Sequence, residues 1–482
     1  MAFRFATRRV RVGLRRGFTV MQPIRMSIFL LLATSIPLFA EQGADEPKKK
    51  GGAQPVDGLK ALKHPDFRVR WKAAHTLAEL GPQAKFALPA LREALEDKHA
   101  LVRVKAAEAL WKIDQTPTTT LMPVLLKALD KGNAEVRAAV PPVLALFGAK
   151  AKLALPALVE ALQDKVLDVK VAVVIALGDL GPVAKDTARD LLNVAKDPEF
   201  VLMEPYVGAS LANLGEGAVP TITDALASKI PERRRLAASA LAGMGPTAKS
   251  AAAELAKALT HDDAAFRALS ARALGRIGPA AKAALPQLDN AVKDMVTGVR
   301  IEAALAAWRI TATPTHVGVL IKALEEKSVP DRDAACQAIA TMKAVAKEAV
   351  DPLAKLLGDK DLRVRAITTL GEIGPSANKA LPAIKTFMKD EDGDTQLRTA
   401  YAVWQISGDT KETMKVLESL LATEKYYTST IHVLGDMGPA AASLLPTLVA
   451  LYREEDVPSD RAALADAIKK IDANLAMKLG IK

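Results

Sequence analysis

The chain has 482 residues, of which 50% are hydrophobic but only 4% aromatic, and it carries a formal net charge of +11. A chain with this much apolar content can bury a core, so the composition excludes a fully disordered polymer. The single cysteine excludes an intrachain disulfide framework and any metal site built from several thiolates.

Residues 1–40 have the features of a secretory signal. They contain seven arginines and no acidic residue, and an uncharged apolar run extends from Ile28 to Ala40. This run is too short to span a bilayer as an ordinary helix, which needs about 20 residues. We therefore predict export, with cleavage after Ala40 and a periplasmic or extracellular location. An uncleaved N-terminal anchor and a twin-arginine signal at Arg8 and Arg9 are the alternatives.

Residues 41–56 are predicted to form a flexible linker, because lysines, adjacent glycines and two prolines leave little to bury. The leader also explains most of the net charge. Without its seven arginines the 66 basic residues fall to 59, against 55 acidic residues. The rest of the chain is nearly balanced, so its overall charge does not predict nucleic-acid binding.

From residue 57 to the C-terminus the chain repeats one unit. The clearest copies read Leu-Gly-x-Ile/Leu-Gly-Pro-x-Ala-Lys-x-Ala-Leu-Pro-x-Leu, and we call the second glycine the mark of each repeat. Equivalent positions recur at a nearly constant interval of about 33 residues, which is typical of a repeat array and not of separate globular domains. The thirteen marks are Gly81, Asp114, Gly148, Gly181, Gly215, Gly245, Gly278, Thr311, Lys343, Gly374, Ser407, Gly438 and Asp472.

Each unit is predicted to contain two helices. The first follows the mark and has a proline in its first turn, as in the segment from Leu88 to Leu95. After an acidic turn, the second helix runs from about Val102 to Ile113 with apolar residues at helical spacing. We expect the glycine to end this helix in the left-handed αL conformation. Because so short a pair cannot bury its own apolar face, the units should stack into an all-α solenoid.

This unit resembles HEAT repeats, in particular those of the bacterial phycobilisome-lyase (PBS-lyase) HEAT-like family. The resemblance covers residues 57–482 and implies an α-solenoid of about thirteen two-helix repeats. It implies no single function, because unrelated roles share this scaffold. Deoxyhypusine hydroxylase, which is built from similar repeats, holds its metal on His-Glu pairs, and this sequence contains no such pair. We therefore expect no metal and no other cofactor.

A basic residue stands eleven positions before the mark in ten of the thirteen units. Since this position lies at the start of the second helix, we predict that its side chain pairs with the turn aspartate of its own or a neighbouring unit. A row of anion-binding sites is the alternative. The residues are Arg70, Arg103, Arg137, Lys170, Arg234, Arg267, Arg300, Arg332, Arg363 and Arg461.

Three units differ from the others in a correlated way. Trp111, Trp308 and Trp404 each stand three residues before a mark that is not glycine. This covariation predicts a second repeat type with a different helix end. We expect the rings to pack in the core, with a ligand-stacking surface as the alternative.

The sequence contains no catalytic constellation. The six histidines are scattered, and there is no HExxH, P-loop or GxGxxG motif. Ser376 and Lys379 match a Ser-x-x-Lys motif, but Ser376 fills a slot that varies between repeats, and Cys336 fills one that otherwise holds alanine. Two residues before the mark, where we expect the inner face, four acidic residues balance four basic ones. This balance predicts no phosphate-tracking groove.

One local concentration of arginines lies in units six to eight. Acidic residues are interleaved with it, so a neutralised surface is one interpretation and a basic pocket for an acidic peptide or glycan is the other. The candidate binding residues are Arg234, Arg235, Arg267, Arg272, Arg276, Arg300 and Arg309.

We therefore predict a non-enzymatic, exported scaffold that binds another protein through the curved surface of its solenoid. The alternative is a lyase-type or other enzyme accessory of the PBS-lyase HEAT-like family. Export disfavours this alternative, because a bilin lyase acts on cytoplasmic phycobiliproteins. We expect a protein partner, no nucleic acid and no membrane span in the mature chain. The polar last unit predicts a monomer.

Overall fold

Residues 55–481 are described by a computed structural model, and within them the chain is helical and contains no strand. The predicted signal peptide lies outside the described residues, as does nearly all of the predicted linker. The first described helix, α2, spans Pro55–Ala61 and begins two residues before the predicted start of the repeats.

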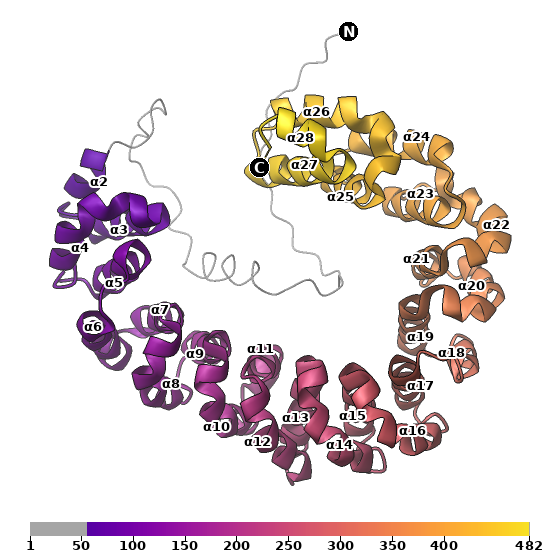
Figure 1. Ribbon diagram of the computed structural model, residues 1–482, viewed down its shortest axis with the longest axis horizontal. Helices are drawn as coiled ribbons and strands as arrows, with labels where there is room; N and C mark the ends of the chain where they lie inside the picture. Colours follow the sequence, from indigo (N-terminus) through magenta and orange to yellow (C-terminus); the bar gives the residue numbers. More distant parts are fainter. Residues whose placement is uncertain (1–54, 482) are drawn as a thin grey trace. The chain divides into compact units, whose positions relative to one another are not determined.

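Within residues 55–481 the helices of an inner row alternate along the chain with those of an outer row, as expected for an α-solenoid (Figure 1). The inner row has one helix for each of the thirteen marks: α3 (Phe67–Leu80), α5 (Ala100–Asp114), α7 (Ala134–Ala145), α9 (Leu167–Leu180), α11 (Phe200–Asn213), α13 (Pro231–Met244), α15 (Ala264–Ile277), α17 (Thr297–Thr311), α19 (Val329–Met342), α21 (Arg363–Ile373), α23 (Gly393–Ser407), α25 (Tyr427–Met437) and α27 (Pro458–Ile471).

The outer row begins with α2 and consists mostly of shorter helices: α4 (Leu88–Ala94), α6 (Thr118–Lys131), α8 (Leu155–Ala161), α10 (Ala188–Asn193), α12 (Val219–Asp224), α14 (Ala252–Ala258), α16 (Leu285–Ala291), α18 (Val317–Ala323), α20 (Val350–Lys355), α22 (Leu381–Lys385), α24 (Thr410–Leu421) and α26 (Leu445–Glu454). A last short helix, α28 (Ala473–Lys478), packs on α27.

Most repeats also contain a 3₁₀ segment between the inner and outer helices, which the sequence analysis did not predict. These segments are η1 (Gly81–Ala87), η2 (Gly148–Ala154), η3 (Gly181–Thr187), η5 (Glu216–Ala218), η7 (Gly245–Ala251), η8 (Gly278–Ala284), η9 (Lys343–Ala349), η11 (Gly374–Ala380) and η13 (Gly438–Leu444). Four others extend outer helices: η4 (Val194–Lys196), η6 (Ala225–Ala227), η10 (Leu356–Gly358) and η12 (Thr386–Lys389).

The expected αL conformation at the mark glycines is wrong. Gly81 has φ 55° and ψ −135°, so its φ is positive but its ψ lies outside the αL region. This is the mirror image of extended backbone, which glycine adopts readily because it has no Cβ. The reason for the difference is η1, which starts at Gly81 and requires the chain to turn there.

The predicted second repeat type is confirmed. In the three tryptophan units the inner helix ends at the mark itself, and the next residue caps it in the αL conformation. These residues are Gln115, Ala312 and Gly408. A connection without a 3₁₀ segment then leads directly into the outer helix.

Small side chains let neighbouring inner helices approach closely. A Cβ added to Gly275 of α15 would lie 2.7 Å from the Cα of Ala306 in α17, which is too close for real atoms. A Cβ added to Gly178 of α9 would be equally close to the Cα of Ser210 in α11. Glycine three residues before the mark is therefore required in these units by contact with the next helix.

The predicted pairing with turn aspartates is confirmed for most of the ten basic residues, whereas Arg103 donates to the carbonyl oxygen of Asp97 and Arg300 to Glu326. Arg70 Nε donates to Asp97 Oδ2 over 2.6 Å, and the other oxygen of Asp97 accepts the backbone N–H of His99. One carboxylate thus closes a turn and ties it to the preceding inner helix. The same spacing of 27 residues joins Arg137–Asp164, Lys170–Asp197, Arg267–Asp294, Arg332–Asp359 and, at 3.7 Å, Arg363–Asp390. We call this series the ladder.

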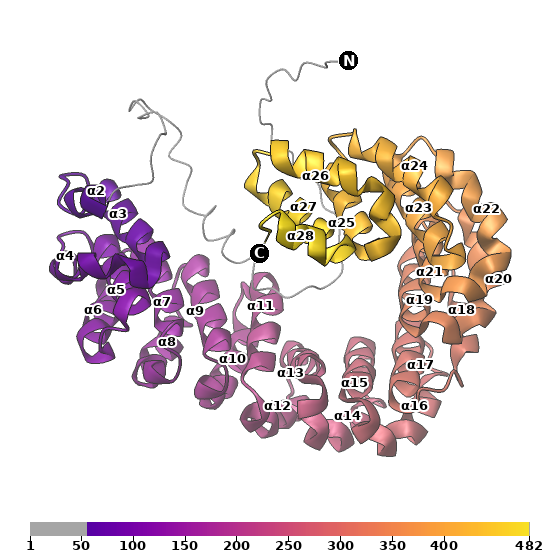
Figure 2. The same ribbon diagram turned by 45° about the horizontal axis from the view of Figure 1, so that its top comes forward.

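One segment of the described chain, Tyr427–Glu454, is long and apolar enough by composition to cross a membrane. It comprises α25, η13 and α26, and the chain turns at Gly438, where φ is 57°. Ile431, Leu434 and Leu448 are fully buried within the solenoid. Both views place these helices in the two rows like the corresponding helices of other repeats (Figure 2). An ordinary repeat explains the hydropathy of this segment.

Candidate functional site

The seven candidate arginines lie on the inner helices α13, α15 and α17. The structure divides them into two groups that differ in position and in partners. Four lie near the starts of inner helices and belong to the ladder or extend it: Arg234, Arg235, Arg267 and Arg300. Three lie further along α15 and α17: Arg272, Arg276 and Arg309. We call the second group the inner-face arginines.

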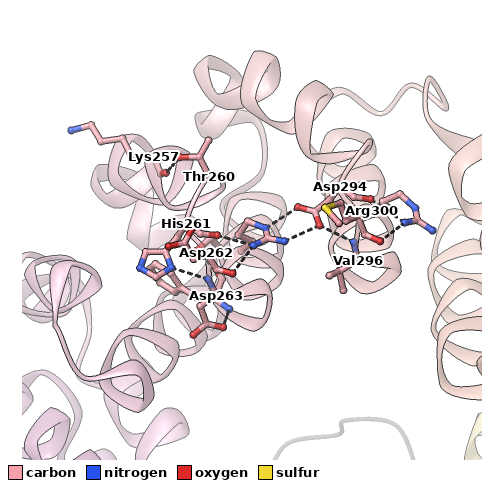
Figure 3. A network of polar contacts seen from close by, with 12 residues as sticks. Lys257, Thr260, His261, Asp262, Asp263, Asp294, Val296 and Arg300 are labelled. Carbon is pink, nitrogen blue, oxygen red and sulfur yellow. Dashed lines mark hydrogen bonds and ion pairs between the residues drawn. The ribbon is translucent and has the colours of Figure 1, made fainter.

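The side chains of the four ladder arginines are hydrogen-bonded within the solenoid. Arg267 donates through Nε and Nη2 to the two oxygens of Asp294, at 2.7 and 2.8 Å. Arg300 donates to Glu326 and to the carbonyl oxygen of Asp294, and Figure 3 shows Asp294 beside Arg300 and Val296. Although burial alone would raise the pKa of Asp263, its hydrogen bonds, above all the one from Arg235, lower it. These bonds hold consecutive repeats together.

Arg234 belongs with them, because its Nη1 donates to the carbonyl oxygen of Ser228 and its guanidinium lies over the Phe266 ring. The ladder arginines therefore have structural roles, and substituting them would test the stability of the repeats rather than binding.

The inner-face arginines have fewer partners. Arg272 donates to Glu302 over 2.6 Å. Within the described part of the chain, neither Arg276 nor Arg309 has a hydrogen bond or an ion pair. Arg276 is exposed, and Arg309 is half-buried with its Cδ close to Gly275, where small size leaves room for the arginine stem.

The charges around Arg309 are mostly of like sign. Burial and then repulsion by Arg276 lower the pKa of Arg309, while Glu302 opposes this shift. Arginine remains protonated at neutral pH despite such a shift, so both guanidinium groups are charged. The three inner-face arginines and Glu302 together carry a net charge of +2.

The position two residues before the mark is accessible along the whole solenoid, as expected for an inner face. None of its thirteen residues is buried: Glu79, Lys112, Leu146, Asp179, Asn213, Gly243, Arg276, Arg309, Thr341, Glu372, Gln405, Asp436 and Lys470. Two lysines at this position have acidic partners one repeat earlier, in the pairs Lys112–Glu79 and Lys470–Asp436. Arg276 and Arg309 instead occupy the same position in adjacent repeats with like charge.

The other chemical candidates have ordinary structural roles. Cys336 is fully buried, and burial raises the pKa of its thiol to about 12. The Lys379 ammonium, which the Ser-x-x-Lys motif would place beside Ser376, donates instead to Asp351 over 2.6 Å. Residues 55–481 contain no cluster of three or more His, Cys, Asp and Glu side chains suited to a metal ion.

Sequence reasoning did not separate the inner-face arginines from the ladder. The signal was available, because ladder residues recur eleven positions before the mark and have an acid 27 residues later, as in Arg137–Asp164 and Arg267–Asp294. Arg276 and Arg309 lie at another position and lack such an acid. Their lack of a partner on the neighbouring helices became visible only in the folded array.

The fold defines an α-solenoid of two-helix repeats. A family model for HEAT repeats matches residues 57–121, 122–202, 219–309 and 317–403, which is more than half of the chain. The chain therefore belongs to the HEAT-repeat family.

Several solved structures share the fold at low identity. Importin beta in an ammonium sulfate condition is 15% identical, with 86% of this chain and 66% of that chain covered and a TM-score of 0.42. The karyopherin Kap121p, bound to the extreme C-terminus of the protein phosphatase Cdc14p, is 15% identical, with 87% and 54% covered and a TM-score of 0.40. An engineered protein is 21% identical, with 73% and 99% covered and a TM-score of 0.32. No curated protein matches the chain.

Proposed function

We propose that this chain is a non-enzymatic, exported scaffold that binds another protein through the inner helices of its solenoid. The observation that carries the proposal is the position two residues before the mark, which is accessible in all thirteen repeats. A regular array of accessible side chains on stacked helices provides an extended surface for a partner.

The finer parts of the proposal rest on the sequence. The proposal of export to the periplasm or the extracellular space rests on residues 1–40. The proposal of the PBS-lyase type of HEAT repeat rests on the amino-acid sequence of the repeat. We propose a monomer whose mature chain has no membrane span and binds no nucleic acid. The inner face supports this last point, because acidic residues such as Glu79 and Asp436 alternate with its lysines.

Site-specific photo-crosslinking tests the proposal. A photoreactive amino acid is introduced at Ser239, which is exposed on inner helix α13, or at Lys257, which is exposed on outer helix α14. After expression of the full chain in its native host, crosslinked products are identified by mass spectrometry.

We expect one defined protein to crosslink from position 239 and not from position 257. Crosslinking from position 257 alone would contradict binding through the inner helices. A purified protein that carries a metal or a bilin chromophore would instead favour the lyase-type alternative.

A further inference from the structure

We propose that the inner-face arginines form a binding site for carboxylate side chains of an acidic, extended segment of the partner protein. The proposal rests on the proposed function and deepens it by giving the chemistry of one contact. Its centre is the pair Arg276 and Arg309, which lie at the same position of adjacent repeats and have no acidic partner.

The fold gains nothing evident from this pair of charges. Elsewhere on the inner face, Lys112 pairs with Glu79 and Lys470 pairs with Asp436, so those charges are compensated within the array. Two neighbouring guanidinium groups repel each other, and this repulsion opposes the stacking of α15 on α17. A bound carboxylate would remove the repulsion and accept hydrogen bonds from both groups, because guanidinium donors match carboxylate geometry.

The surroundings fit one or two carboxylates on an extended segment. Glu302 already neutralises Arg272, to which it is bonded at 2.6 Å, so a net charge of +2 remains. The adjacent inner-face positions are uncharged and accessible: Ser239 and Gly243 on α13, and Gln337 and Thr341 on α19. Gln337 and Thr341 donate within α19, but the hydroxyl oxygens of Ser239 and Thr341 and the amide oxygen of Gln337 can still accept hydrogen bonds from a peptide backbone.

Calorimetric titration of the full chain tests the site with defined probes. The first probe is a short synthetic peptide of alternating glutamate and serine, and the second is the same peptide with glutamine in place of glutamate. Inorganic phosphate and a sulfated oligosaccharide are the third and fourth. We expect the glutamate peptide to bind and the glutamine peptide not to bind.

Three variants assign the binding to the proposed residues. The double variant Arg276→Gln, Arg309→Gln should weaken binding of the glutamate peptide by roughly tenfold or more, the size of one lost charge-assisted contact. Lys112→Gln, a charge removal at the same position of another repeat, should leave binding unchanged. Glu302→Gln should tighten binding, because it raises the local net charge to +3.

Thermal melting of the double variant serves as its folding control. Since the two arginines have no hydrogen bond or ion pair within the described chain and glutamine keeps part of the side-chain stem that packs beside Gly275, the double variant should melt close to the wild-type temperature. No binding of the glutamate peptide, or equal binding by the double variant, would overturn the proposal. Binding of phosphate or of the sulfated oligosaccharide through these arginines, without the peptide, would also overturn it. If any of these results overturned the carboxylate site, a partner that still crosslinked from position 239 would continue to support the scaffold function.

Discussion

Lys343 occupies a backbone conformation that in most other repeats belongs to the mark glycine. It has φ 53° and ψ −138°, close to the 55° and −135° of Gly81. The Cβ of an L-residue makes this region costly, by roughly 1–3 kcal/mol for such strained positions. The chain keeps the conformation because η9 starts at Lys343 as η1 starts at Gly81. Stacking of the repeats therefore overrides the local preference of the residue.

Replacing Lys343 with glycine should stabilise the protein. We expect Lys343→Gly to raise the free energy of unfolding by about 1 kcal/mol, because it removes the Cβ strain. Urea unfolding followed by circular dichroism measures the change. Lys343→Ala is the control, since it removes the exposed side chain but keeps the Cβ. An equal gain from both variants would show that the lysine side chain, and not the backbone, is the cause.

A second residue-scale effect concerns the ladder carboxylates. The hydrogen bond from Arg137 lowers the pKa of Asp164, and burial opposes this shift without cancelling it. A carboxyl group with a lowered pKa in the folded state contributes stability above its unfolded value of 3.8, and that contribution is lost as the pH falls through the folded value.

Asp164→Asn should lower the free energy of unfolding by about 2 kcal/mol at pH 7, which is typical of hydrogen bonds to charged groups. The gap between the variant and the wild type should shrink as the pH falls below 4, because the wild-type carboxyl group then becomes protonated. Denaturant unfolding at several pH values measures the gap. Asp130→Asn is the matched control, since Asp130 follows Arg103 at the ladder spacing but pairs only with Lys131 at the surface. A gap that is independent of pH would contradict the ion-pair explanation.

At the scale of elements, the tryptophans of the second repeat type differ in how they contact the next inner helix. Trp111 Nε1 donates to the carbonyl oxygen of Leu146 over 3.0 Å, and its ring lies 4.6 Å from that of Phe147. The ring thus ties α5 to the end of the next inner helix, where other units have a small residue. Trp308 takes the same position in α17, but its buried Nε1 has no hydrogen-bond partner among the described residues. The two residues share a position in the repeat and differ in hydrogen bonding.

This difference predicts unequal effects of the same substitution. Trp111→Phe should lower the free energy of unfolding by about 0.5–1.5 kcal/mol, because it removes this hydrogen bond from the carbonyl oxygen of Leu146. Trp308→Phe should cost clearly less, since no hydrogen bond is lost. Urea unfolding of both variants measures the difference. A larger loss for Trp308→Phe would contradict the assignment of the hydrogen bond.

At the scale of the whole array, the buried apolar residues form two clusters, and the partly buried Met388 packs against both. One cluster of buried residues extends from Leu62 to Ile406, and a second extends from Leu397 to Ile481. The two meet in α23, where Thr399 is fully buried and its hydroxyl group has no partner within the described residues. Stability in a repeat array is approximately a sum of repeats and their interfaces, so a weak interface separates cooperative units.

We therefore expect the repeats after α23 to unfold before the rest. Hydrogen exchange followed by mass spectrometry in increasing urea should show loss of protection in residues 410–481 first. Leu417→Ala, in the second cluster, should advance only this transition, and Leu144→Ala, in the first, only the other. A single concerted loss of protection along residues 55–481 would contradict the division.

The sequence by itself determined the period, the all-α class, the order of the two helices and the positions of the ladder's basic residues. It could do so because these features are local or recur at fixed spacing. The turn aspartate that pairs with Arg137, 27 residues further along, is visible without a structure. So is the replacement of glycine by Asp114 beside Trp111.

Only the tertiary structure decided which charges remain available. The repeat position distinguishes Arg267 from Arg276, but only the structure shows that Arg267 is bonded to Asp294 while Arg276 has no hydrogen bond or ion pair within residues 55–481. The structure also decided that the mark glycines begin 3₁₀ segments instead of adopting αL, because the path to the outer helix depends on how the next repeat packs. Whether a side chain is used by the fold depends on residues one repeat away, and their distance in space is set by stacking.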